Sequence, residues 1–144
     1  MLSRNLVFWE VDVQVDFMLP GGKLYVPGAE KLLPNIRRLT DAARQGRVFL
    51  VSHGCYHTQD DPEFTAFPPH CIKGTPGAML VPEALTEQVV TVPNEPTAAL
   101  PDDLSRFQQI LLEKQHCSYI KDESEQGINR EVYLRFPNIP SYGF

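Results

Sequence analysis

Cysteine is scarce in this 144-residue chain, which contains three, at positions 55, 71 and 117. We expect no disulfide framework, because the number is odd and no secretory leader is evident, and reduced thiols suit a cytoplasmic protein. Basic residues are also few: 13 Lys and Arg stand against 18 Asp and Glu, and the net charge of −5 argues against nucleic acid as a partner. Long apolar runs are missing too, since Glu10 and Asp12 interrupt the first one, so we expect no membrane span.

What the chain does contain is the composition of one globular domain, with 42% hydrophobic and 22% charged residues. Apolar runs at 6–13, 48–51, 89–92 and 109–112 predict strands. Apolar residues at helical spacing predict a helix that starts near Ala29 and is capped at Gly46. This alternation predicts an α/β fold with a mainly parallel sheet.

Two further stretches do not follow the alternation. Residues 52–82 are rich in proline and glycine without periodicity, which predicts a long functional loop. From Lys121 to Phe144 only residues 131–136 have the pattern of a strand. We therefore predict one α/β domain over 1–120 and a divergent tail over 121–144.

Two charged residues end predicted strands. Asp12 closes the first strand and Lys114 follows the apolar run at 110–112. In a parallel sheet both would meet at the carboxyl edge, where α/β proteins bind ligands, and could form a catalytic ion pair. On spacing alone, an ordinary turn residue and a solvated lysine are the better fit.

The predicted loop carries a cluster of histidines and thiols. His53, Cys55 and His57 alternate along an extended segment, and His70 and Cys71 follow in the same loop. Imidazole and thiolate ligands suit Zn²⁺, although single histidines are often plain hydrogen-bonding groups. Cys71 fits a nucleophile or a small buried apolar residue.

Two strings together resemble the isochorismatase-like cysteine hydrolases, and nicotinamidases in particular. Asp12 to Phe17 followed by Gly21 to Ala29 is similar to the opening motif of the family, and Pro68 to Ala78 is similar to its second signature. The resemblance covers roughly residues 6–116. It implies a three-layer α/β/α sandwich, and the chain resembles a C-terminally incomplete member.

The resemblance also implies site residues. Asp12 matches the general base and Lys114 the lysine of the family's Asp-Lys-Cys triad. The metal positions of nicotinamidases fall on Cys55, His57 and His70, with Cys55 where the family has Asp, so a zinc ion is the expected cofactor if the site is retained. No residue matches the late nucleophilic cysteine.

The expected function is therefore a hydrolase that cleaves a C–N bond of a small amide such as nicotinamide. The alternative is an inactive, truncated member that binds a small molecule or a metal, and under that alternative the chain hydrolyses no amide at an enzymatic rate. The expected partners are a small-molecule substrate and a second copy of the chain, because an incompletely covered sheet favours self-association.

Overall fold

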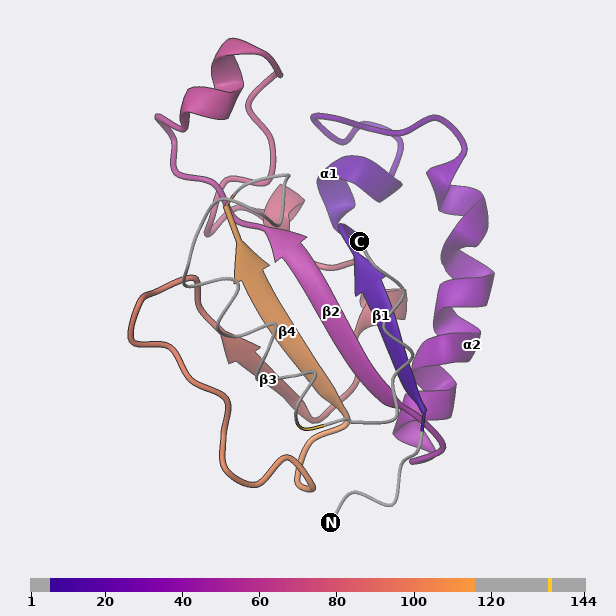
Figure 1. Cartoon of the computed structure of the whole chain (residues 1–144). Coiled ribbons are helices and arrows are strands. Elements are labelled where there is room, and N and C mark those ends of the chain that lie inside the picture. The colour runs from indigo at the N-terminus through magenta and orange to yellow at the C-terminus, as the bar shows by residue number, and fades with distance from the viewer. Residues whose placement is uncertain (1–5, 116–134, 136–144) are drawn as a thin grey trace.

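The computed structural model describes residues 6–115 and residue 135, and its centre is a four-stranded parallel sheet. The strands are β1 (Val7–Val11), β2 (Phe49–Cys55), β3 (Val89–Val92) and β4 (Gln109–Lys114). They lie in the order β1-β2-β4-β3 (Figure 1), and every pairing is parallel. The prediction of an α/β fold on a mainly parallel sheet is confirmed.

Strand β2 is longer than its apolar run, because it continues through His53 and Gly54 to Cys55. The prediction of a loop from Ser52 onward was wrong at these positions. Both neighbouring strands pair with β2, and all seven of its residues are buried. Pairing on both sides satisfies the backbone polar groups, so residues with poor strand propensity are held extended by their neighbours.

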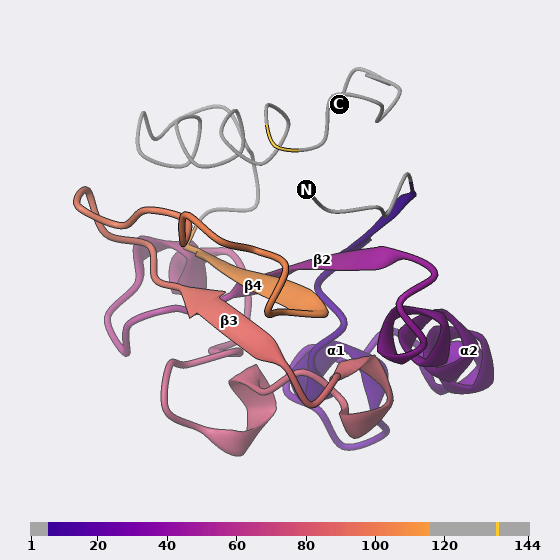
Figure 2. The same cartoon turned by 90° about the horizontal axis from the view of Figure 1, so that it is seen from below.

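The helices lie on one face of the sheet (Figure 2). Helix α2 (Leu33–Arg44) follows a 3-10 turn, η1 (Ala29–Leu32), and Gly46 takes the left-handed conformation just after the helix, at φ 71°. Ile36 and Ala43 of α2 are buried in two clusters that include strand residues Leu111 and Leu50. Helix α1 (Val15–Met18) was not predicted, because four residues show no period.

The opposite face of the sheet is covered at β3 and β4 by the long connection between these two strands (Figure 2). Leu100 and Leu104 of that connection pack against Phe49, Val51 and Ile110 of the strands. Burying a side chain of this size contributes about 1.5–3 kcal/mol. The core therefore has two parts, one on each side of the sheet.

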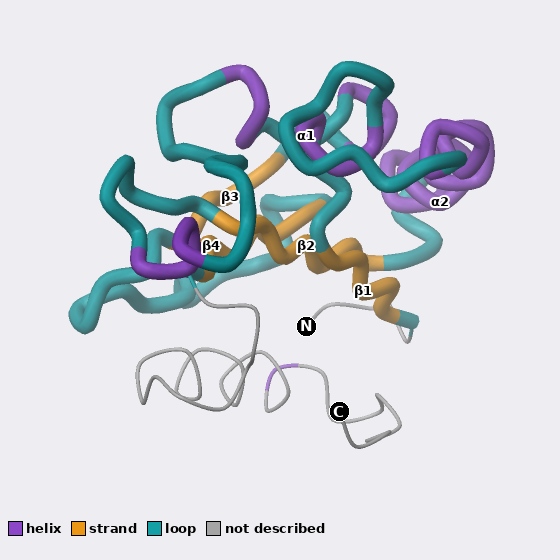
Figure 3. The backbone as a smooth tube through the Cα atoms, turned by 90° about the horizontal axis from the view of Figure 1, so that it is seen from above, coloured by secondary structure: helices purple, strands orange, loops and turns teal. Residues whose placement is uncertain are grey.

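The short helical segments gather at the carboxyl ends of the strands. Helix α1 follows β1, and the 3-10 turns η2 (Pro62–Thr65) and η3 (Pro76–Ala78) follow β2. Figure 3 looks down on this end, where loops and short turns surround the ends of the strands. A further turn, η4 (Pro82–Ala84), packs against α2.

None of the helices that the structure describes is both long and apolar enough to span a bilayer. Of the predicted tail, only Arg135 falls among the described residues, and its guanidinium donates to the backbone oxygens of Pro101 and Asp102. The strand predicted over 131–136 and the rest of the tail lie outside the described residues.

Candidate active site and metal centre

Asp12 and Lys114 form an ion pair at the carboxyl end of the sheet. Lys114 Nζ lies 3.1 Å from Asp12 Oδ1. Asp12 follows β1 in the left-handed conformation, at φ 59°, and its N–H donates to the His53 oxygen. Lys114 is the last residue of β4. The two strand ends therefore bring together the residues that the sequence paired, and their catalytic role stays a prediction.

The thiol of Cys55 lies against this pair. Cys55 Sγ is 3.4 Å from Asp12 Oδ1, and Cys55 is the register partner of Lys114 across the β2–β4 pairing. Cys55 is fully buried, whereas a third of the Asp12 side chain is exposed. A carboxylate, an ammonium and a thiol thus converge where ligands bind in open α/β sheets.

Gln14 fixes the backbone of Cys55. The Gln14 amide accepts from Cys55 N–H at 2.8 Å and donates to the Cys55 oxygen at 2.6 Å and to the Ala78 oxygen at 2.7 Å. Gln14 is fully buried, so these bonds are shielded from water. The end of β2 and the loop at Ala78 are therefore tied to one side chain.

The electrostatics of the site favour a charged lysine. Burial acts to lower the pKa of Lys114, but the neighbouring Cys55 and Asp12 outweigh it and hold that pKa above its ordinary value. Burial raises the pKa of the Cys71 thiol well above its ordinary value, and the neighbouring Cys55 and Asp16 act in the same direction. Lys114 is therefore a fixed cation, and Cys71 is a protonated thiol.

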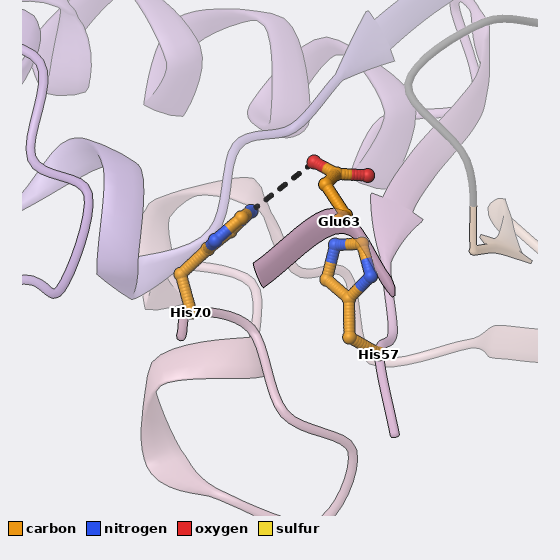
Figure 4. A group of neighbouring side chains, drawn as sticks. All are labelled: His57, Glu63 and His70. Atoms are coloured by element: carbon orange, nitrogen blue, oxygen red, sulfur yellow. Dashed lines mark ion pairs between the residues drawn. The ribbon is translucent and has the colours of Figure 1, made fainter. Parts of the chain in front are cut away.

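A second group joins His57, Glu63 and His70 (Figure 4). One ligand atom from each lies within 4.8 Å of the others, and the two imidazole rings are 4.9 Å apart. Both histidines are buried, and His70 Nε2 lies 3.9 Å from Glu63 Oε1. Two imidazoles and one carboxylate, converging in this way, form a donor set that suits Zn²⁺.

The hydrogen bonds of the two histidines leave one nitrogen of each for a ligand. His57 Nδ1 bonds Asp61 Oδ2 at 3.0 Å, and His70 Nδ1 bonds the Pro68 oxygen at 2.8 Å. His57 Nε2 is buried and has no hydrogen-bond partner among the described residues. A metal-bound histidine usually has its other nitrogen bonded to a carboxylate or a carbonyl, as here. The residues present therefore fit a metal ion.

Asp61 orients His57 and Glu63 together. Its carboxylate accepts from Glu63 N–H at 2.9 Å and from Gln115 Nε2 at 3.1 Å, besides its bond to His57. Burial opposes the ionised form, but these bonds hold the pKa of Asp61 below its ordinary value. Asp61 is a charged acceptor that fixes the His57 ring.

The structure brings His57 and His70 together as the sequence predicted, but the third member of the group is Glu63. Cys55, predicted as a ligand, has its thiol against Asp12 instead. Sequence reasoning missed both Asp61 and Glu63. The acidic segment 60–63 between the two histidines was an available signal, because a carboxylate near two histidines is a common third ligand. His53, which had no expected role, packs edge-on against Trp9.

The segment from Pro68 to Ala78 is anchored by a buried carboxylate. Asp16 accepts from Cys71 N–H at 2.7 Å and from Lys23 N–H at 3.0 Å. Cys71 takes the left-handed conformation, at φ 44°. At the other side of the segment, Lys73 Nζ lies 2.6 Å from Glu113 Oε2 of β4. These contacts hold the segment in the shape that places His70 beside His57.

Comparison with protein families shows to which family the chain belongs. The model of the isochorismatase domain matches residues 6–122. The chain belongs to the isochorismatase family. No protein with a curated description matches it significantly.

Solved structures of isochorismatase-like proteins share the fold. An isochorismatase-like hydrolase from Alkaliphilus metalliredigens aligns with a TM-score of 0.62 at 20% identity, over 92% of this chain and 62% of its own. A nicotinamidase from Bacillus subtilis aligns with a TM-score of 0.62 at 24% identity, over 94% of this chain and 66% of its own. A pyrazinamidase from Pyrococcus horikoshii, solved in complex with zinc, aligns with a TM-score of 0.59 at 22% identity, over 91% of this chain and 64% of its own.

The chain therefore spans about two thirds of the length of these isochorismatase-like structures. At this level of identity the likeness shows the isochorismatase-like fold, and it does not decide the substrate.

Proposed function

We propose that this isochorismatase-family chain is a cysteine hydrolase that cleaves a C–N bond of a small amide. The observation that carries the proposal is the Asp12–Lys114 ion pair at the carboxyl end of the sheet, with a thiol 3.4 Å from the carboxylate. Asp12 acts as the general base that takes the thiol proton and returns it to the leaving nitrogen. Lys114 holds the Asp12 carboxylate in place through their ion pair.

The group formed by His57, Glu63 and His70, here called the metal group, would act on the same substrate as Asp12 and Lys114. His57, Glu63 and His70 would hold Zn²⁺, which supplies a Lewis acid to polarise a substrate donor atom. Asp61 keeps His57 oriented toward the ion through its hydrogen bond to Nδ1. The nicotinamidase and pyrazinamidase neighbours support a small cyclic amide such as nicotinamide as the first substrate to try.

Ammonia release from nicotinamide and from other small primary amides tests this proposal. Asp12→Asn removes the proton acceptor without changing the size of the side chain, and we expect a rate loss of about 100-fold to 10,000-fold. Asp103→Asn is the matched control, because Asp103 is exposed and its carboxylate accepts hydrogen bonds from the neighbouring Ser105. Equal rates in all three proteins would refute the proposed role of Asp12.

The second candidate function is a non-catalytic module that binds a small molecule or a metal. It is favoured by one observation: His57, Glu63 and His70 bring three possible ligand atoms together without any need for a thiol. Zinc binding without ammonia release from any amide would support this candidate and contradict the hydrolase.

A further inference from the structure

We propose that Cys55, which ends strand β2, is the thiol that attacks the substrate at the Asp12–Lys114 pair. The inference rests on the proposed hydrolase function and deepens it by naming the nucleophile. Sequence reasoning left this role empty, because no cysteine stands at the expected late position and Cys55 falls on an expected metal position. In the structure, the Cys55 thiol lies beside the Asp12–Lys114 pair, where a nucleophile is needed.

The contacts of Cys55 are those that an attacking thiol needs. Cys55 Sγ lies 3.4 Å from Asp12 Oδ1, which is within reach for proton transfer. Lys114 stands beside Cys55 in register and pairs with the same carboxylate at 3.1 Å. Asp12, the proposed base, therefore contacts both the Cys55 thiol and the Lys114 ammonium.

Cys71 provides an internal comparison. It is as fully buried as Cys55, and the two belong to the same packed cluster. The Cys71 thiol lies 3.9 Å from the Gly77 oxygen, whereas the Cys55 thiol lies 3.4 Å from the Asp12 carboxylate. Burial alone is therefore equal in the two, and the difference between them is the Asp12–Lys114 pair.

The backbone around Cys55 is held in place for the reaction. The bidentate contact with Gln14 fixes the peptide groups on both sides of the Cys55 Cα. Cys55 itself is fully buried, whereas a third of the Asp12 side chain is exposed.

The reaction balances with water as the only co-reactant. The thiol proton moves to Asp12, Sγ forms a bond to the amide carbon, and the C–N bond breaks as Asp12 returns the proton to the leaving nitrogen. Ammonia leaves, and Cys55 carries a thioester. Water then attacks the thioester with Asp12 again as base, which releases the carboxylic acid and restores the thiol.

The test uses the full chain and 4-nitrophenyl acetate, a small acyl donor. Nitrophenolate release gives the rate, and tandem mass spectrometry locates the acetyl group. Hydroxylamine treatment removes a thioester and leaves acetylated lysine unchanged. We expect the acetyl thioester on Cys55, a rate loss of about 100-fold in Asp12→Asn, and no change in Cys71→Ala.

Cys55→Ser keeps the size of the side chain, and circular dichroism reports whether it folds. An acetyl thioester on Cys71 or Cys117, no thioester at all, or labelling of Cys55 that is insensitive to Asp12→Asn would overturn the inference. Amide hydrolysis that is lost in Asp12→Asn but kept in Cys55→Ser would refute the role of Cys55 and leave the hydrolase function standing. Labelling of Cys55 without release of ammonia from any amide would support Cys55 as the nucleophile and refute the proposed hydrolysis of amides.

Discussion

Two carboxylates in one short segment act differently on the metal group. Asp61 bonds the His57 Nδ1 atom and is buried, whereas Glu63 offers an oxygen toward the space between the two rings. In the proposed zinc site, the same segment would therefore supply both a ligand and the residue that orients another ligand. Such outer partners matter, because removing one typically lowers metal affinity by about 10-fold to 100-fold.

Zinc content distinguishes Glu63 from Cys55 as the third ligand. We expect about one zinc per chain in the wild-type protein and in Cys55→Ser, and a marked loss of zinc in Glu63→Gln, because that amide is a weak ligand. Elemental analysis after dialysis measures it. Glu83→Gln is the matched control, since Glu83 is likewise half-buried behind a proline at the start of a 3-10 turn. Loss of zinc in Cys55→Ser alone would restore Cys55 as the ligand.

Glu10 of β1 makes stability depend on pH away from the site. Burial raises its pKa from 4.5 to about 7, and the hydrogen bond from Ser52 Oγ offsets this only in part. The folded chain therefore keeps a proton on Glu10 that the unfolded chain releases. The stabilisation is present in full at pH values below 4.5 and is lost as the pH rises through about 7.

Glu10→Gln mimics the protonated form at every pH. We expect this variant to exceed the wild type in unfolding free energy at about pH 8, by up to roughly 3 kcal/mol, and to match it near pH 4. Urea unfolding at several pH values measures the difference. Glu95→Gln, at an exposed position, should show no such trend. A constant difference between Glu10→Gln and wild type across the range would contradict the assigned pKa.

At the scale of elements, the sequence predicted those whose residues alone define a pattern. The apolar runs of β1, β3 and β4 and the helical period of α2 were sufficient. The last part of β2, helix α1 and the 3-10 turns were missed, because tertiary contacts and not local propensity define them. For the same reason the sequence could pair Asp12 with Lys114 but could not place Cys55, whose position depends on the extension of β2.

The loops around the site fit together through Asp16 and Gly77. A Cβ atom at Gly77 would lie 2.2 Å from Asp16 Oδ2, far inside van der Waals contact. The backbone of Gly77 is not in the left-handed region, so the requirement for glycine is purely steric. The missing side chain at position 77 makes room for the carboxylate that anchors Cys71 and Lys23.

Gly77→Ala should destabilise the chain by about 1–3 kcal/mol, because it overfills this space. In the Asp16→Ala background the carboxylate is gone, and the same substitution should cost much less. The two changes are therefore expected to be non-additive in a double-mutant cycle by about 0.5–3 kcal/mol. Thermal or urea unfolding of the four proteins provides the measurement. Additive effects would show that Asp16 and Gly77 are not in contact.

At the scale of the whole molecule, β1 is an edge of the described sheet. It pairs with β2 and with no other described strand. Val11 at its end is exposed, and so is Leu6 just before it. The isochorismatase-like structures that share the fold are about half as long again as this chain. Exposed apolar side chains at the edge of a sheet favour association with another chain.

We therefore predict that the protein self-associates through β1. Sedimentation velocity over a range of concentrations should show a reversible shift from monomer to oligomer. Val11→Lys places a charge on the edge and should move that shift to concentrations at least about 10-fold higher, because charged residues disfavour edge pairing. Val26→Lys changes an equally exposed valine in the loop after α1 and should leave the shift where it is. A wild-type protein that stays monomeric at every concentration would contradict self-association, and equal effects of the two substitutions would remove β1 as the interface.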